Sequence, residues 1–409
     1  MSRMLNTSNL GELGKVSMCK RVLKHETSEN GDIPFYKIST FGGVTTTFIS
    51  NELYKSFREK YSYPKIGDVL ISAAGTIGKT VIFDGEPSYF QDSNIVWIAN
   101  DEKKVTNQFL YYYYQTEPWV ATNGSTIKRL YNENIRNLKI TYPELSTQKQ
   151  IAKVLSDLDA KIEVNNKINQ ELEAMAKTLY DYWFVQFDFP DQNGKPYKSS
   201  GGNMVFNKAL KREIPEGWES GELSDIANIT MGQSPPGDSY NEEGEGEVFY
   251  QGCTDFGQRY PSNRKFTTKP SRFSKKGDIL LSVRAPVGTM NIANEDCCIG
   301  RGLAALNSKD GCISYLDGVL HYMKQVFDRR NSSGTTFGSI TKGDLFSLPV
   351  VKPNEKILEN FDSISKPMFE KQNTIGLENQ KLSELRDWLL PILMNGQVRV
   401  KLVEEEINL

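Results

Sequence analysis

The stretch IGDVLIS at residues 66–72 returns as KGDILLS at residues 276–282, and this repetition indicates how the whole chain is organised. Each copy has a Gly-Asp pair followed by a short aliphatic run, which is typical of a turn that leads into a buried β-strand. A longer pair of segments has the same separation, since GSTIKRLYNENIRNLKITYP at 124–143 matches GTTFGSITKGDLFSLPVVKP at 334–353. The sequence therefore predicts that one structural unit occurs twice.

All of these matches share one offset of 210 residues, the difference between positions 66 and 276. The tripeptide GEL at 11–13 also matches GEL at 221–223 with this offset. Chance does not hold one register over so long a distance, so we interpret the chain as a tandem duplication. The offset relates six pairs of identical residues: Gly67 and Gly277, Asp68 and Asp278, Gly78 and Gly288, Gly124 and Gly334, Leu138 and Leu348, and Pro143 and Pro353.

The run SAAGTIGKT at 72–80 has the end of a phosphate-binding loop, but the duplication argues against a nucleotide site. The first glycine of that motif is replaced by Ala73, and the β-branched and aromatic residues after Lys79 do not favour the helix that the motif requires. At the repeated position, Thr289 and Met290 stand in place of the lysine and the threonine. We therefore expect a strand and a glycine turn here.

Each half begins with a strand-rich globular domain and ends with a helix. Turn signals such as FGG, GEP, PPG and FGQ separate short apolar runs in the globular parts, which predicts mixed α/β (α+β) domains. The expected organisation is a first domain at 1–145, a helix at 146–186, a connector at 187–212, a second domain at 213–353, a helix at 354–395 and a tail at 396–409. The connector is rich in Gly, Ser and Pro, so we expect it to be exposed.

Apolar residues alternate at spacings of four and three in both helical segments, which predicts a coiled-coil seam. Connectivity makes the two helices antiparallel, because the second helix has to return to the first domain. We expect Asn165 and Asn169 to fix the register of this pair; the alternative is that they are solvated positions on a helix that is buried from another side. Pro367 is expected to break or kink the second helix. The seam residues are Ile151, Leu155, Leu158, Ile162, Leu172, Leu179 and Trp183 in the first helix, and Ile375, Leu382, Leu385 and Leu389 in the second.

Composition excludes several classes of protein. The 409 residues contain 49 Lys and Arg against 51 Asp and Glu, so no global field indicates a nucleic-acid or membrane partner. His25 and His321 are too few for a histidine metal site or a catalytic triad. The five cysteines form no C-x-x-C motif, which predicts reduced thiols in a cytoplasmic protein. No run of apolar residues approaches the length that is needed to span a membrane.

Catalytic motifs are not evident either. The only Pro-Pro pair, in SPPG at 234–237, lacks the acid or amide and the aromatic residue of an adenine methyltransferase. No G-x-G-x-x-G follows a strand, and PDQNGK at 190–195 has no counterpart in the other half. Glycine, proline and apolar scaffold repeat, whereas polar turn residues differ, so we predict a non-catalytic protein with two differently specialised binding faces and no metal.

Polar residues at equivalent turns are the candidates for these faces. Hydroxyls and glycines suit phosphate oxygens, while Lys37 and Gln251, at the ends of two corresponding strands, suit base edges in a major groove. A plain polar turn is the alternative interpretation for each single residue. The candidates for DNA binding are Lys37, Ser39, Ser125, Thr126, Lys128, Arg129, Gln251, Asp255, Arg284, Thr335 and Thr336.

Three segments resemble one known family. The segment QIAKVLSDLDAKIEVNNKINQELEAMAKTLYDYWFVQFDF at 150–189 closely resembles the central helical region of specificity (S) subunits of Type I DNA restriction-modification systems. MGQSPPGDSYN with FYQGCTDFG, within 231–257, looks like the start of a target recognition domain of these subunits, and LRDWLLPILMNGQV at 385–398 looks like their C-terminal helical end. The resemblance covers essentially the whole chain and its domain order.

The resemblance implies a DNA sequence-specificity subunit without catalysis, in which each recognition domain reads half of a bipartite site and the helices set the spacer. It implies two modification subunits that dock along the helices, bind S-adenosylmethionine and methylate adenine at N6. The seam residues given above are the candidates for this docking, and restriction subunits that use ATP and Mg²⁺ are implied where present. This chain itself is expected to bind no cofactor. A protein–protein adaptor with two binding ends and an enzyme with an unrecognised motif remain as alternatives.

Overall fold

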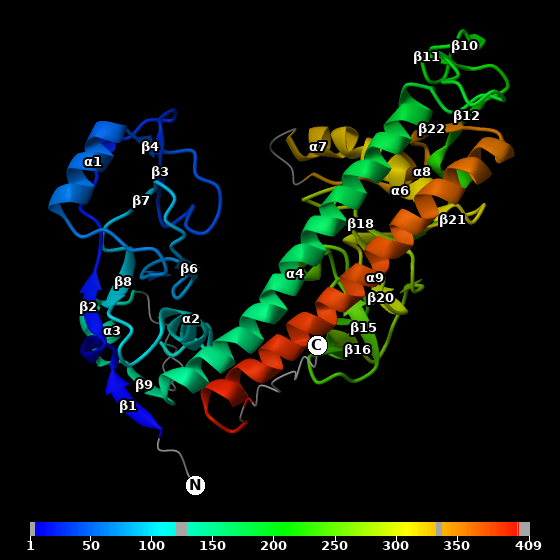
Figure 1. Ribbon diagram of the computed structural model, residues 1–409. Coiled ribbons are helices and arrows are strands. Elements are labelled where there is room, and N and C mark those ends of the chain that lie inside the picture. Colours follow the sequence, from blue (N-terminus) through cyan, green and yellow to red (C-terminus); the bar gives the residue numbers. More distant parts are fainter. Residues whose placement is uncertain (1–4, 120–128, 333–337, 399, 401–409) are drawn as a thin grey trace, which may run out of the picture. The chain divides into compact units, whose positions relative to one another are not determined.

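The computed structural model describes residues 5–119, 129–332, 338–398 and 400 (Figure 1). The chain forms two compact units, of which the first comprises Met1–Lys161 and Leu382–Leu409 and the second Ile162–Lys381. Two long helices, α4 (Leu145–Tyr180) and α9 (Glu355–Met394), contribute a section to each unit. Among the residues that the structure describes, no helix is both long enough and apolar enough to cross a membrane.

Unit 1 contains a four-stranded sheet of order β2-β8-β5-β6, a three-stranded sheet of order β4-β3-β7 and the pair β1-β9. Their bounds are β1 Asn6–Asn9, β2 Gly14–Ser17, β3 Ile33–Tyr36, β4 Phe48–Ile49, β5 Val69–Ser72, β6 Thr80–Ile82, β7 Tyr89–Phe90, β8 Ile95–Asn100 and β9 Lys139–Tyr142. The shorter helices are α1 Asn51–Lys60, α2 Asn107–Gln115 and α3 Asn132–Asn137, with 3₁₀ turns at Leu10–Glu12 and Lys24–Glu26.

Unit 2 repeats this plan with sheets of order β13-β21-β18-β19 and β14-β16-β15-β20-β17, and the pair β12-β22. The strands are β10 Met204–Asn207, β11 Arg212–Pro215, β12 Glu219–Glu222, β13 Ala227–Met231, β14 Tyr240–Asn241, β15 Glu247–Tyr250, β16 Phe266–Thr267, β17 Phe273–Ser274, β18 Ile279–Ser282, β19 Met290–Ile292, β20 Cys297–Ile299, β21 Leu303–Ser308 and β22 Pro349–Lys352. The helices are α5 Leu223–Ile226, α6 Ile313–Tyr322, α7 Lys324–Ser332 and α8 Lys342–Phe346, with 3₁₀ turns at Gly237–Ser239 and Cys253–Asp255.

The repeated stretches IGDVLIS and KGDILLS form a fully buried strand in each domain. All four residues of β5 and all four of β18 are buried. In β5, Val69 and Ile71 belong to one core cluster and Leu70 belongs to another, so the strand is covered on both faces. Such a strand needs an unbroken aliphatic run rather than an alternating one, because neither face meets water. This requirement explains why the sequence signal is strong here.

The two domains are confirmed as copies of one fold, with one adjustment to their alignment. The amide of Leu10 donates to the carbonyl of Leu138 at 2.8 Å, and the amide of Leu223 donates to that of Leu348 at 2.8 Å. Leu223 is therefore equivalent to Leu10, so the expected match of GEL at 221–223 with GEL at 11–13 is wrong by three residues. The first tripeptide lies in a 3₁₀ turn and its C-cap Leu13, just before β2, whereas the second spans the end of β12 and the first residue of α5.

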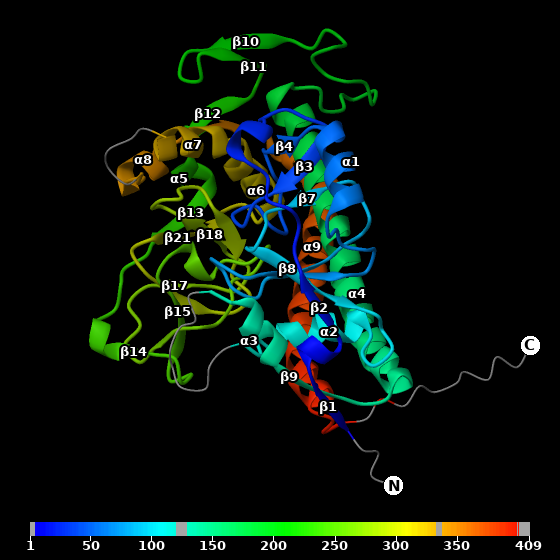
Figure 2. The same ribbon diagram turned by 90° about the vertical axis from the view of Figure 1, so that its left-hand side faces the viewer.

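The helices α4 and α9 are antiparallel within each unit, and they lie side by side in Figure 1 and Figure 2. In unit 2, Asn165 donates to the side chains of Glu378 at 2.8 Å and Asn379 at 2.9 Å, while the rings of Trp183 and Phe361 lie 5.6 Å apart. Trp183 comes later in the chain than Asn165 and contacts the earlier residue of α9, Phe361, so the two helices run in opposite directions. Asn165 is 1% exposed, which favours the interpretation that it fixes the register.

Burial follows the expected seam closely in α4 but less closely in α9. Ile151, Leu155, Trp183 and Ile375 are buried. Leu385 differs, since its side chain is 42% exposed and its neighbour Arg386 makes a 2.9 Å ion pair with Asp159 of α4. A straight helix of 3.6 residues per turn drifts from a strict 3.5 repeat, which turns such a position away from its partner helix. The half-buried seam residues are Leu158, Ile162, Leu172, Leu179, Leu382 and Leu389.

Of the break or kink expected at Pro367, the break is not observed, because α9 continues through this residue to Met394, and a kink stays a prediction. Phe361, Ser365 and Phe369, on either side of the proline, are buried in unit 2. This packing outweighs the ~3 kcal/mol that a proline costs in a helix interior. The helix is therefore held by tertiary contacts rather than by local propensity.

The end of α4 and the connector differ from a plain exposed linker. Residues Asp181–Val185 form a π-helical turn in which Trp183 and Phe184 are both buried. Phe187 and Phe189 are also buried, and the ring of Phe189 stacks on Trp218 with centroids 4.9 Å apart. The start of the connector is thus part of the core of unit 2, because its aromatic side chains are buried although the connector as a whole is polar.

Candidate nucleic-acid interface

In unit 1, Lys37 immediately follows β3, the central strand of the smaller sheet. β3 runs parallel to β7, with Phe35 opposite Tyr89 and Tyr36 opposite Phe90. Beyond the strand, the amide of Ile38 donates to Oε1 of Gln91 at 2.8 Å, so the chain after β3 is fixed to the turn after β7. The side chain of Lys37 consequently extends from a well-anchored backbone, which suits a residue that contacts a ligand in a defined position.

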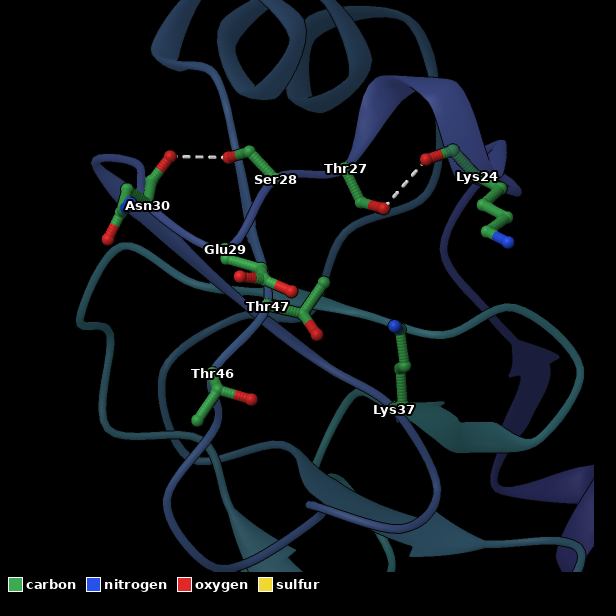
Figure 3. Close-up of a pocket in the computed structure, with 8 residues that line it drawn as sticks. All are labelled: Lys24, Thr27, Ser28, Glu29, Asn30, Lys37, Thr46 and Thr47. Atoms are coloured by element: carbon green, nitrogen blue, oxygen red, sulfur yellow. Dashed lines mark hydrogen bonds between the residues drawn. The ribbon is translucent and has the colours of Figure 1, made fainter.

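Lys37 lines an open concavity of about 680 Å³ that is formed by polar and charged residues. Figure 3 shows its ammonium group directed toward the space between Thr47 and Lys24. The carboxylate of Glu29 lies in the same concavity (Figure 3). Two ammonium groups, one carboxylate and several hydroxyls can donate to and accept from a polar ligand. Lys24, Thr27, Ser28, Glu29, Asn30, Lys37, Thr46 and Thr47 line this concavity.

In unit 2, Gln251 follows strand β15 in the same way. β15 runs parallel to β20, and the side chains of Gln251 and Ser234 are hydrogen bonded, with Nε2 of Gln251 2.8 Å from Oγ of Ser234. A Cβ atom at Gly300 would lie 2.7 Å from Oε1 of Gln251, so only glycine allows this close approach. The amide of Gly302 also donates to the carbonyl of Gln251 at 3.2 Å. Gln251 is therefore held in one orientation.

Lys37 and Gln251 occupy equivalent positions of the two domains. Phe35 pairs with Tyr89 in unit 1 as Phe249 pairs with Cys298 in unit 2, and each candidate lies two residues after that phenylalanine. The expected correspondence of the segments PFYKIST and VFYQGCTDFG is thus confirmed. One backbone position carries an ammonium donor in one domain and an amide, which both donates and accepts, in the other.

Asp255 is a poor candidate for a direct contact. Its residue is 9% exposed, and its Oδ1 accepts a hydrogen bond from Nε of Arg264 at 2.7 Å. This hydrogen bond raises the pKa of Arg264, which keeps its guanidinium charged. Because its carboxylate is already bound, Asp255 organises the loop, and the half-exposed Arg264 beside it is the outward-facing group.

The remaining described candidates lie near a second turn of each domain. Ala74 and Arg129 form an isolated antiparallel β-bridge in unit 1, and Arg284 and Ser339 form the equivalent β-bridge in unit 2. Both members of this pair are related by the offset of 210 residues, so Arg284 corresponds to Ala74 and Ser339 to Arg129. Nη2 of Arg129 donates to Oγ of Ser93 at 2.9 Å, so its guanidinium is partly engaged. Arg284 and Ser39 are exposed. The candidates Ser125, Thr126, Lys128, Thr335 and Thr336 lie outside the described residues.

Sequence reasoning missed several residues beside Lys37 and Gln251. Thr46 and Thr47 reach the concavity of unit 1 from the segment before β4. In unit 2, Ser234 orients Gln251, and the exposed Arg301 lies in the turn between β20 and β21, its amide 3.4 Å from Oγ of Ser234. These residues are distant in sequence from Lys37 and Gln251, so no local motif around those two residues could have identified them.

The structure also accounts for the sequence motifs of doubtful function. SAAGTIGKT forms the end of β5, a turn and the start of β6, and β5 and β6 are antiparallel, so no phosphate-binding helix follows Lys79. The cysteines are free, and burial raises the pKa of Cys19 to about 12. Among the described residues, no three His, Cys, Asp or Glu side chains are grouped so that they could hold a metal ion.

Comparison with known proteins identifies a family that has this architecture. The family model described as "Type I restriction modification DNA specificity domain" matches residues 4–174 and again residues 215–386. The chain belongs to this family. Two matches in tandem agree with the duplication and with the domain order expected from the sequence. Members of this family are specificity subunits, the non-catalytic components of Type I systems, which agrees with the prediction of a binding protein.

Individual relatives of this specificity subunit support the assignment. A putative Type I restriction enzyme MjaX specificity subunit from Methanocaldococcus jannaschii is 33% identical over 82% of this chain and 79% of its own length. A putative specificity subunit S.HindORF215P from Haemophilus influenzae is 51% identical, over 42% of this chain and 45% of that protein, so this match spans less than half of either. The crystal structure of the S subunit from M. genitalium has the same fold, with a TM-score of 0.58, 17% identity and 98% of both chains covered.

Proposed function

We propose that the two domains of this specificity subunit each read one half of a bipartite double-stranded DNA site. The observation that supports this most directly is the exchange of Lys37 for Gln251 at one equivalent, anchored position. Lysine donates to the acceptors O6 and N7 of guanine, whereas glutamine pairs with N6 and N7 of adenine. A scaffold that is kept while its outward polar residues change is what independent reading of two sequences requires.

The composition of the concavity in unit 1 suits base edges better than a run of phosphates. The carboxylate of Glu29 would repel a phosphate but can accept a hydrogen bond from the amino group of cytosine. Lys24 and Lys37 supply the donors. The near-neutral charge of the chain fits an assembly in which other subunits provide much of the contact to the DNA backbone.

The chemistry would belong to partner subunits. We propose two modification subunits that carry S-adenosylmethionine and methylate adenine, and restriction subunits that use ATP and Mg²⁺ where the system has them. Within unit 2, Val164, Ile168 and Met175 of α4 are 52%, 39% and 52% exposed. Their spacing places them on one face of the helix, so they form an apolar stripe that the pairing with α9 leaves open. The modification subunits would dock on this stripe rather than on the seam.

Point variants test this function in the assembled methyltransferase. Lys37→Ala should relax base preference in one half-site by about tenfold and leave the other unchanged, and Gln251→Ala should do the reverse. Lys103→Ala is the matched control, because this lysine is 82% exposed and pairs with Asp101. Methylation of a randomised DNA library, read by sequencing, measures both halves at once. If each variant altered both halves together, the two domains would not read independently.

A further inference from the structure

The loop that carries Gln251 is longer than its counterpart and reaches the long helix α9. Residues 37–47 join β3 to β4 in unit 1, and residues 251–265 join β15 to β16 in unit 2, so the second loop is four residues longer (15 against 11). The added length brings Arg259, Tyr260 and Pro261 against α9, and all of these contacts lie within unit 2.

Two side chains of this loop bind the same residue of α9. Nε of Arg259 donates to Oδ1 of Asn373 at 2.7 Å, and the hydroxyl of Tyr260 donates to the main-chain carbonyl of Asn373 at 3.0 Å. The guanidinium of Arg259 also lies over the ring of Phe369, 4.6 Å from its centroid. A charged hydrogen bond, a neutral hydrogen bond and a cation–π contact thus act at one place. We call residues 259–261 the clamp.

The surface of α9 has a residue that makes room for the clamp. A Cβ atom at Gly376 would lie 2.7 Å from Cε2 of Tyr260, so the ring lies directly on the helix backbone. Glycine in a helix interior costs roughly 1 kcal/mol relative to alanine. Its presence in the middle of α9 is explained by the ring of Tyr260. One turn later, Nε2 of Gln380 donates to the carbonyl of Pro261 at 3.3 Å.

The loop between the clamp and Gln251 is stiff. The amide of Gly257 donates to the carbonyl of Tyr260 at 3.1 Å, and the amide of Ile292 donates to that of Arg259 at 2.8 Å, which joins the clamp to β19. The amide of Ser262 donates to the carbonyl of Asp255 at 2.8 Å, and Arg264 binds the carboxylate of Asp255. A displacement of α9 is therefore transmitted to the segment that carries Gln251 rather than absorbed by it.

We propose that the clamp is a positioning device for specificity, in which Arg259 and Tyr260 fix the Gln251 edge of the second domain to α9. This inference rests on the proposed function in DNA recognition. The reading edge of this domain then has a set distance and orientation with respect to the helix, and that setting determines which spacer the domain accepts. Arg259, Tyr260 and Asn373 act through Gln251 and need not touch DNA.

Unit 1 uses the equivalent segment differently. Thr45 is buried and its hydroxyl donates to the carbonyl of Phe35 at 2.9 Å, while Thr46 and Thr47 face the polar concavity around Lys37. The same loop thus lines the candidate reading surface in one domain and contacts the helix in the other. The clamp is therefore expected to affect the second half-site and not the first.

Two variants loosen the clamp by different means. Gly376→Ala places a methyl group against the ring of Tyr260, while the double variant Arg259→Met with Tyr260→Phe removes both hydrogen bonds to Asn373 and adds no bulk. Arg259→Lys keeps a cation over Phe369 and a donor for Asn373, so it should retain most of the function. Gly343→Ala is the glycine control, because the nearest atom to its Cβ would be Oγ1 of Thr341 at 4.0 Å.

The test uses the full chain in its complex with modification subunits. DNA substrates carry the parental site, a site with one base pair added to or removed from the spacer, or a substitution in either half. We expect Gly376→Ala and the double variant to lower discrimination against altered spacers and altered second half-sites by about three- to tenfold, with the first half-site unaffected. Gly343→Ala should match the parent, and Arg259→Lys should remain within about twofold of it.

The outcomes separate the two hypotheses. A parental complex that methylates DNA without sequence preference would overturn the proposed function itself. If the parent is specific and the double variant, shown to be folded by thermal unfolding, keeps parental discrimination in both halves and for all spacers, the clamp is merely structural. Equal loss in both half-sites would also overturn the proposal, because it would indicate general destabilisation.

Discussion

Lengthening both long helices by one heptad tests whether they set the distance between the half-sites. The structure identifies where the insertions should go. Position 378–379 of α9, opposite Asn165, lies in the segment that the second domain contacts through Asn373 and Gly376, so an insertion at 371–378 would damage those contacts. The boundary between the units offers a better place, after Lys161 in α4 and after Lys381 in α9.

The size of the effect follows from helix geometry. Seven residues at ~1.5 Å each lengthen a helix by ~10 Å, and seven steps of ~100° return its apolar face to within ~20° of the original direction. Ten ångströms correspond to about three base pairs at ~3.4 Å per step. Three base pairs also rotate the groove by ~100°, so distortion of the DNA is expected to absorb part of the mismatch. Both half-sites should be retained, with a spacer that is about two to four base pairs longer.

Sequencing of methylated adenines in cells that carry the variant reads the new spacer directly. The control is an insertion of four residues at the same two places, which turns the apolar faces by ~40° and should reduce both folding and methylation. An insertion in α4 alone is a second control, since it shifts the antiparallel register. An unchanged spacer in an active, doubly extended enzyme would show that the helices only join subunits and do not measure distance.

Three further predictions concern single residues. Asn165→Ala should lower the free energy of unfolding by about 1–3 kcal/mol in chemical denaturation, because it leaves Asn379 without a buried donor, whereas an unchanged value would refute its role in register. Burial opposes protonation of His321, but hydrogen bonds with Asp317 and Glu173 outweigh it and raise the pKa of His321 to about 10. Because this exceeds the ordinary value of 6.5, the stabilisation is complete below about pH 6.5 and is lost as the pH rises toward 10, so the stability difference from His321→Gln should shrink over that interval. Lys79→Ala should leave methylation within about threefold of the parent, and abolished methylation together with lost nucleotide binding would restore the phosphate-loop interpretation.

Stretches that are constrained by burial could be predicted from the sequence. IGDVLIS and KGDILLS had to be aliphatic because both faces of β5 and β18 are covered, and this constraint preserved the register of the duplication. The seam of α4 was visible for the same reason, since the burial of Ile151 and Leu155 recurs with the helical period. Where tertiary contacts overrule a local preference, the sequence misled, as at Pro367 within the unbroken α9.

The candidate site was only partly predictable. Lys37 and Gln251 could be proposed as candidates because each follows an apolar strand that repeats, which marks a position even when its side chain differs. Asp255 could not be judged, because its partner Arg264 comes from the other side of the same loop and only the folded loop brings their charges to 2.7 Å.

The duplication, the strand at the centre of each domain and the pairing of two long helices could be inferred from the residues alone, because burial imposes periodic patterns on the order of residues. Which polar side chains are exposed and which are already hydrogen bonded within the protein became visible only in the folded chain. Hydrogen bonds are short and directional, so they depend on atoms that are brought together from distant segments. Close packing depends on distant segments in the same way. Neither Tyr260 nor Gly376 has a sequence signal, yet the ring of Tyr260 lies against the backbone at Gly376.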